Sequence, residues 1–216
     1  MRTPEAKALR RQAILDAARA IFAGMAYAEI RVQDIVSATG LAKGTFYLYF
    51  QSKESLFLAL LLDELKAWFD ELELQPAGLS EARLARLLTD TLVARPLLRR
   101  LLGLLHNVLE AGLDVASALS FKQQLAGLMA PMAFKLEQAL PVLESGDGAR
   151  LLLNLHAIVI GLEQMAPTGP VLKDVLARPE LSFLEQDFKT ELEQMLVRLL
   201  AGWPTKMEDH NGKHSR

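Results

Sequence analysis

Cysteine is absent from the 216-residue chain, so disulfides, thiolate metal sites, iron–sulfur clusters and a cysteine nucleophile are all excluded. Long apolar runs are also missing. The longest, Leu151–Leu162, is interrupted by Asn154 and His156 and falls short of the roughly 20 residues that a membrane-spanning helix requires. The charged segment Met1–Arg11 lacks the apolar stretch of a signal peptide. We therefore expect a soluble, cytoplasmic protein with no membrane partner.

The net charge of −2 is too small for a general polyanion binder, but the charge is unevenly distributed along the chain. Residues 1–55 hold eight Lys/Arg against five Asp/Glu, a balance of +3 that leaves −5 on residues 56–216. A basic N-terminal segment followed by an acidic remainder is typical of a DNA-binding module joined to a second module.

The period-two alternation of β-strands is missing too, whereas apolar residues recur at helical spacing almost throughout. The sequence thus predicts an all-α fold. Thr3 and Ser52 are suitable N-caps for the first and fourth helices. Pro131 should kink the seventh helix, and 167–179 should form a loop. We expect about nine helices: 4–24, 32–38, 43–49, one following Ser52, 80–94, 96–113, 117–140, 148–165 and 183–202.

The segment Val32–Phe50 (VQDIVSATGLAKGTFYLYF) has the pattern of a helix-turn-helix. Gly40 lies at the turn, where the chain passes through a left-handed conformation that glycine adopts at little cost. Four apolar side chains should hold the two short helices together: Ile35, Val36, Leu41 and Phe46.

The second short helix should present a face that fits the major groove of DNA. Lys43, Thr45, Leu48 and Tyr49 are expected on that outer side. The hydroxyl of Tyr47 and the ammonium of Lys53 are expected to hold phosphates beside the groove.

The sequence from Gly40 to Phe50 (GLAKGTFYLYF), followed by Ser52–Phe57 (SKESLF), closely resembles the signature of tetracycline-repressor-like (TetR/AcrR) transcriptional regulators. Ala17–Phe22 and Asp34-Ile35 are similar to the flanking helices of that family. The resemblance covers about residues 8–68. It implies an all-helical homodimer with an N-terminal three-helix, helix-turn-helix head that binds a double-stranded DNA operator. The C-terminal body would bind a small-molecule effector and dimerise through its last two long helices.

This resemblance sets the expected domain bounds and the expected DNA contacts. The DNA-binding domain should span 8–68, the effector-binding and dimerisation domain 76–203, and a disordered tail 204–216. The resemblance implies that Lys43, Gly44 and Thr45 lie at the start of the recognition helix and that Leu48 and Tyr49 lie along its groove face. It also implies that Tyr47 and Lys53 bind phosphate. Arg31 stands where the family often has Thr or Ser, so its side chain would make that phosphate contact. Ala42 replaces a common serine cap, and Val36 replaces a small alanine.

In the body, His106 and Glu110 lie one turn apart on one helix face, with Asn107 beside them. They could form a satisfied core pair, or a polar contact point in a ligand pocket. Two residues without further clustering are weak evidence for metal, so we expect no metal site. His156 could face the interior of the body, and Met129 and Met132 could line a soft apolar pocket. We expect no cofactor, because no nucleotide, flavin or phosphate fingerprint is present.

Helices 148–165 and 183–202 are expected to form a two-fold, four-helix dimer interface. In 148–165, Asn154 shares its side with the small residues Ala157 and Gly161 and with Ile158. The sequence therefore predicts a ligand-responsive regulator. Most simply, it is a repressor that binds a palindromic operator as a dimer and is released by a small, mostly apolar effector. The alternative is a helical protein-interaction module that has lost DNA binding. An enzyme is disfavoured, because neither clustered carboxylates nor a nucleophile-elbow motif is present.

Overall fold

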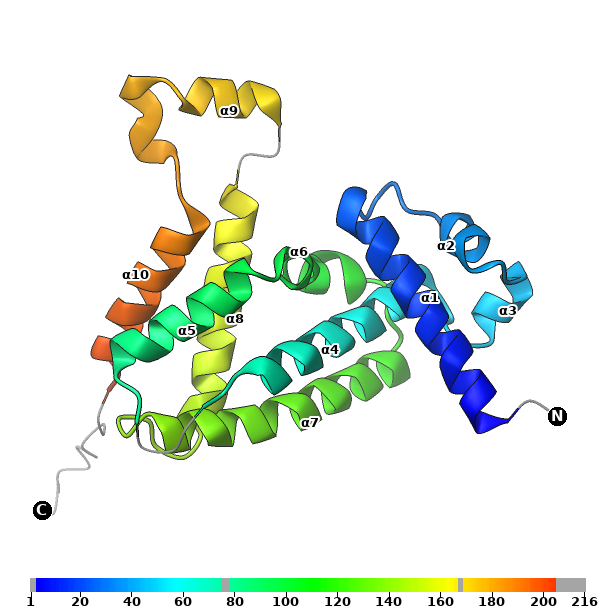
Figure 1. The fold of residues 1–216 in the computed structure, drawn as a ribbon, viewed down its shortest axis with the longest axis horizontal. Helices are drawn as coiled ribbons and strands as arrows, with labels where there is room; N and C mark the ends of the chain where they lie inside the picture. The colour runs from blue at the N-terminus through cyan, green and yellow to red at the C-terminus, as the bar shows by residue number, and fades with distance from the viewer. Residues whose placement is uncertain (1–2, 75–77, 167–168, 205–216) are drawn as a thin grey trace, which may run out of the picture.

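A computed structural model describes residues 3–74, 78–166 and 169–204 (Figure 1). Every regular element within these ranges is helical, which confirms the all-α prediction. The N-terminal elements are α1 (Pro4–Gly24), α2 (Val32–Thr39), α3 (Lys43–Tyr47) and α4 (Lys53–Glu71). The body consists of α5 (Glu81–Val93), α6 (Pro96–Leu104), a π-helical turn (Leu105–Leu109), α7 (Val115–Ala139), α8 (Asp147–Met165), α9 (Pro170–Leu176), a 3-10 helix (Pro179–Leu184) and α10 (Phe188–Ala201).

Some predicted segments lie outside the described residues. These are 205–216 of the predicted tail, 75–77 between α4 and α5, and 167–168 of the predicted loop. Within the described ranges, no helix combines the length and the apolarity that crossing a bilayer requires.

The predicted helix starts in the N-terminal half are confirmed. The Thr3 hydroxyl accepts a hydrogen bond from the Ala6 amide at 3.3 Å at the start of α1. Ser52 and Ser55 cap α4 reciprocally, each side-chain oxygen accepting from the other residue's amide at 3.1 and 3.0 Å. Side-chain oxygens at these positions satisfy amides that have no partner inside the helix.

Three predicted bounds in the second half are wrong. The loop expected at 167–179 contains α9, because proline at the first helical position starts a helix rather than breaking it, and Pro170 and Pro179 each open a helical element. The helix expected over 96–113 changes to a π-helical turn after Leu104. The last helix begins at Phe188, where the Asp187 carboxylate accepts from the Thr190 amide at 2.8 Å and so caps it. Nine helices is therefore an approximate count.

Helix α4 packs in both the head and the body, whose buried residues form one continuous core. Near its start, Phe57 packs edge-on against Phe22 and Tyr27, with ring centroids 5.3 and 4.9 Å away. Near its end, Trp68 and Phe69 are buried in the body, where α4 packs against α6, the π-helical turn and α7. The head formed by α1–α3 and the body formed by α5–α10 are thus joined through one continuous helix (Figure 1).

The crossing of α7 and α8 depends on a glycine. Gly148, in the first turn of α8, is buried against the backbone of Ala133, and a Cβ atom there would overlap the Ala133 carbonyl. The close approach lets the two helices bury their apolar faces together.

We predict that Gly148→Ala destabilises the chain by about 1–3 kcal/mol, since the added methyl group forces the two backbones apart. Gly127→Ala is the matched control: Gly127 lies within α7 with open space around it, and alanine in a helix gains about 0.5–1 kcal/mol over glycine. Urea unfolding monitored by circular dichroism measures both. Equal effects of the two substitutions would contradict the account of the crossing.

Candidate nucleic-acid interface and ligand cavity

The helix-turn-helix forms as the sequence predicts. Gly40 follows α2 in the left-handed region, with φ +66°, and turns the chain toward α3. Ile35, Val36 and Phe46 are buried between the helices and the rest of the head, and Leu41 packs against them.

One face of α3 is open to solvent. Lys43, Gly44, Tyr47 and Leu48 are exposed, and their spacing of three and four places them on the same side of the helix. Leu48 leaves 65% of its surface exposed, which is unusual for a leucine next to a packed core. Thr45 is half-buried at the edge of this face.

Tyr49 is placed differently from the other expected groove residues. It is half-buried and lines a hollow between the head and the body, together with Arg11 of α1 and Phe121 of α7. The structure therefore separates Tyr49 from the exposed face of α3.

Lys53 has a structural role that the sequence did not reveal. Its ammonium donates hydrogen bonds to the carbonyl oxygens of Tyr27 and Ile30, both at 3.0 Å, and lies 3.9 Å from the centroid of the Tyr27 ring. These contacts hold the loop between α1 and α2 against α4. An ammonium has three N–H donors, so one remains for a phosphate.

Arg31 occupies the N-cap position of α2. Its amide donates to the Asp34 carboxylate at 2.7 Å, so Asp34 stabilises the helix start where a Thr or Ser cap would otherwise do so. The Arg31 residue itself is exposed.

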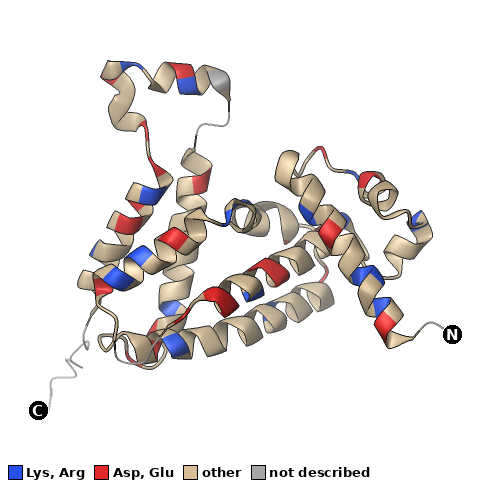
Figure 2. Cartoon of the chain, viewed as in Figure 1, with Lys and Arg blue, Asp and Glu red and all other residues tan. Residues whose placement is uncertain are grey.

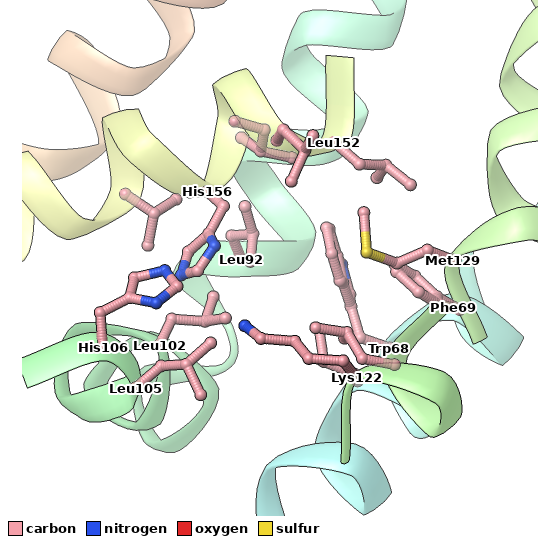
Figure 3. Close-up of a pocket in the computed structure, with 15 residues that line it drawn as sticks. Trp68, Phe69, Leu92, Leu102, Leu105, His106, Lys122, Met129, Leu152 and His156 are labelled. Atoms are coloured by element: carbon pink, nitrogen blue, oxygen red, sulfur yellow. The ribbon is translucent and has the colours of Figure 1, made fainter. Parts of the chain in front are cut away.

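A cavity of about 120 Å³ lies in the body between α4, α6, the π-helical turn, α7 and α8 (Figure 3). Its wall is mostly apolar and includes Trp68, Leu102 and Met129. Of the expected ligand-binding residues, His106, Met129 and His156 line it. The structure does not bring the others to the cavity wall: Asn107 is exposed, Met132 is buried in the core, and Glu110 stands behind the wall.

Glu110 holds two of the cavity's polar groups. Its carboxylate forms an ion pair with Lys122 Nζ at 2.6 Å and contacts His106 Nδ1 at 3.2 Å. Burial by itself would raise the pKa of Glu110, but the hydrogen bonds from Lys122 and His106 outweigh burial and lower that pKa. The anionic carboxylate thus ties the π-helical turn to α7. His106 thus contacts Glu110 and lines the cavity, with 51% of its side chain exposed rather than buried in the core.

His156 lies beside His106, with ring centroids 5.2 Å apart. Its Nε2 atom is buried and has no hydrogen-bond partner among the described residues. Burial lowers the pKa of His156, which favours the neutral imidazole. A buried polar atom without a partner is costly and calls for an explanation, such as a ligand that fills the site.

The π-helical turn also places the cavity close to the head. α6 runs into this turn and carries Arg100, whose guanidinium donates to the carbonyl oxygens of Phe22 at 2.7 Å and Met25 at 2.8 Å, at the end of α1. The same guanidinium lies over the Phe22 ring at 4.1 Å. Arg19 of α1 forms a further ion pair with Glu64 of α4 at 2.7 Å. In Figure 2 the ribbon of α1 is coloured for basic residues at several positions, and the ribbon of α4 is coloured for acidic residues at several positions.

Among the residues that the structure describes, no three His, Asp or Glu side chains lie close enough together to hold a metal ion.

The N-terminal and C-terminal parts of the chain each match the model of a known protein family. Residues 14–60 match a family model described as "Bacterial regulatory proteins, tetR family", and residues 58–206 match "Tetracyclin repressor-like, C-terminal domain". The chain is 40% identical over 52 residues to the HTH-type transcriptional regulator EthR of Mycolicibacterium smegmatis, a match that covers 24% of each chain. It is 33% identical over 60 residues to the fatty acid metabolism regulator protein of Bacillus subtilis, covering 28% of this chain and 31% of that one. The matches thus span about a quarter to a third of the length of these relatives.

Among solved structures, the chain is similar to the fatty acid degradation regulator FadR from Bacillus halodurans. The TM-score is 0.56 and the sequence identity 19%, over 89% of this chain and 95% of that chain. A likeness at this identity shows a shared fold.

We predict that Lys53→Met destabilises the chain by about 1–3 kcal/mol, because two carbonyl groups lose a charged donor. Lys43→Met should change stability by less than about 0.5 kcal/mol, since the Lys43 side chain is exposed on α3. Thermal and urea unfolding without DNA distinguish the two. If both variants were as stable as the parent chain, the structural role assigned to Lys53 would be wrong.

Proposed function

Because the chain belongs to the TetR family of bacterial transcriptional regulators, we propose that it binds a palindromic operator as a homodimer. It represses transcription until a small, mostly apolar effector releases it. The observation that carries this proposal is the solvent-exposed face of α3 on a well-packed helix-turn-helix. Such a face is what enters a major groove. The family is one of regulators rather than enzymes, and its site of action, the operator DNA, lies in the cytoplasm.

The residues on the outer side of α3, together with Leu48 that follows it, have proposed roles in DNA binding. Lys43, Thr45 and Leu48 contact base edges, the last through its methyl groups against thymine. Gly44 lets the backbone approach the DNA closely, and the Tyr47 hydroxyl donates to a phosphate.

Three further residues support this contact from its margins. The remaining N–H of Lys53 and the exposed side chain of Arg31 reach phosphates on either side of the groove. Tyr49, half-buried beside the body, contributes at the edge of the recognition helix rather than at its centre. We retain 8–68 as the DNA-binding domain and 76–203 as the effector-binding and dimerisation domain.

The homodimer is proposed to form through 148–165 and 183–202. One side of α8 is open to a partner: Leu153 and Ala157 are exposed there and Gly161 is half-buried. Ile158, in contrast, packs on the chain's own core. The 3-10 helix before α10 exposes Phe183 by 77%.

The arm made of α9 and the 3-10 helix strengthens this proposal. It stands clear of the body beyond the ends of α8 and α10 (Figure 1) and packs chiefly on itself. It nevertheless exposes five large apolar side chains: Val171, Leu172, Val175, Phe183 and Leu184. A cluster of this kind marks an interface, and its continuity with the outward sides of α8 and α10 favours a second copy of the chain as the partner.

Effector release requires that the cavity and the head be coupled. The π-helical turn and α6 form one segment, with His106 at the cavity and Arg100 bonded to the end of α1. We propose that a ligand shifts this segment, and that Arg100 carries the shift to the head. The two recognition helices then no longer match successive major grooves about 34–36 Å apart.

We predict that duplexes selected from a random pool at physiological salt contain a palindrome. Tyr47→Phe should weaken binding to every duplex by a few-fold, as expected for one hydrogen bond. Leu48→Ala should change the sequence preference instead. The control Val115→Ala alters a residue of the body that is 85% exposed. Fluorescence anisotropy gives the affinities. No enrichment by the refolded, ligand-free chain would favour the protein-interaction alternative.

We predict that Phe183→Glu converts the dimer to monomer, because the charge would be buried at the interface. Val115→Glu places the same charge on a similarly exposed apolar position in the first turn of α7 and should leave the dimer intact. Sedimentation velocity at several concentrations measures the assembly. A Phe183→Glu chain that remains dimeric would exclude the arm from the interface.

A further inference from the structure

We propose that the effector is a small monocarboxylate: an apolar body of roughly the size of one six-membered ring, with its carboxylate held by Lys122, His106 and His156. This inference rests on the proposed function of the cavity as the effector site, and it specifies the chemical class of the ligand.

The polar groups of the cavity wall are all nitrogen groups. They are the ammonium of Lys122, the imidazoles of His106 and His156, and the indole of Trp68. Trp68 Nε1 already donates to the Thr91 hydroxyl at 3.0 Å. Carboxylate, hydroxyl and amide side chains do not occur among the described residues that line the cavity. A cationic ligand would find no acceptor in this wall and would lie next to the ammonium of Lys122, whereas a carboxylate offers acceptors to every one of the remaining groups.

The hydrogen-bonding groups without a partner also favour a carboxylate ligand. Lys122 forms an ion pair with Glu110, and at least two of its three N–H groups remain for a ligand. Figure 3 shows its ammonium reaching from α7 into the space in front of the two imidazoles. His156 Nε2 lies in that region without a partner. A carboxylate at this point would satisfy Nε2 once the ring is protonated and would bridge α7, the π-helical turn and α8.

Exposure places the charged group at the mouth of the cavity. The side chains of Lys122 and His106 are 50% and 51% exposed, so a carboxylate between them keeps part of its hydration. This lowers the desolvation cost that makes fully buried ion pairs unfavourable. Behind the mouth, the wall is formed by Leu102, Met129, Trp68 and other apolar side chains.

The size of the cavity limits the apolar body. Its volume is about 120 Å³, and an apolar cavity of about 150 Å³ accommodates benzene. Benzoate and octanoate are therefore suitable probes, one a rigid ring and the other a flexible chain.

The charges around the site should make the affinity for a carboxylate depend on pH. Glu110 and Lys122 neutralise each other, so a second carboxylate needs another positive charge, which protonation of His156 supplies. The charged and titratable groups that act on His156 are Glu110, His106 of the π-helical turn and Lys122 of α7; α4 and α5 present apolar side chains and the Trp68 indole there. Because the free ring is neutral and the bound ring is protonated, affinity should rise as the pH falls from about 8 to about 6.

The test is calorimetric titration of the refolded full chain with six probes of matched shape: benzoate and octanoate, benzamide and octan-1-ol, benzylamine and octylamine. We expect both carboxylates to bind about tenfold to a hundredfold more tightly than the neutral probes, and the amines to bind least. Lys122→Met and Lys122→Gln should remove the preference for carboxylates. Lys135→Met, at an exposed position on the same helix, should leave it unchanged.

Three outcomes would overturn the proposal: neutral probes that bind as tightly as the carboxylates, a carboxylate affinity unchanged by either Lys122 substitution in a folded chain, or no binding of any probe. Circular dichroism establishes that each variant is folded. Selection of DNA duplexes is a separate measurement. A chain that enriches a palindrome but shows no carboxylate preference loses only the ligand class assigned here, whereas a chain that enriches no duplex loses the proposed function.

Discussion

The arrangement of this protein depends on α4, which buries one face against the head near its start and against the body near its end. Its first turns complete the aromatic core of the head around Phe57, and its last turns place Trp68 against the cavity of the body. Because a packed helix transmits displacement rather than absorbing it, the head cannot change its angle to the body without disturbing the packing at both ends of α4. The Arg100 contacts to the end of α1 add a second connection, which begins at the π-helical turn. The proposed ligand site at His106 therefore lies next to both connections.

Local features were the most predictable from the sequence. The caps at Thr3 and Ser52 and the left-handed Gly40 depend on a few neighbouring residues, and each type of residue has a strong conformational preference. The apolar stripe of α4 was predictable too, since helical periodicity reports which face is buried. The helix-turn-helix pattern also predicted the exposure of Lys43 and Leu48, although Tyr49, expected on the same face, is half-buried.

Features that depend on contacts distant in sequence were not predictable. Lys53 binds the carbonyl oxygens of Tyr27 and Ile30, and a lysine after a cap carries no sign of such partners. The proline-rich segment between α8 and α10 was expected to be a loop, although prolines can also open helices, as Pro170 and Pro179 do. The sequence placed His106 and Glu110 on one face correctly, but Lys122 joined them only through the packing of α7.

The most direct test of the central claim is amide hydrogen exchange, by mass spectrometry, of the chain with and without an enriched duplex. If α3 is the recognition helix, bound DNA slows exchange in peptides that cover 31–53, while peptides from α5 and α10 exchange at their original rates. Unchanged exchange over 31–53 in a chain saturated with duplex, or protection confined to the body, would contradict the assignment of DNA binding to this face.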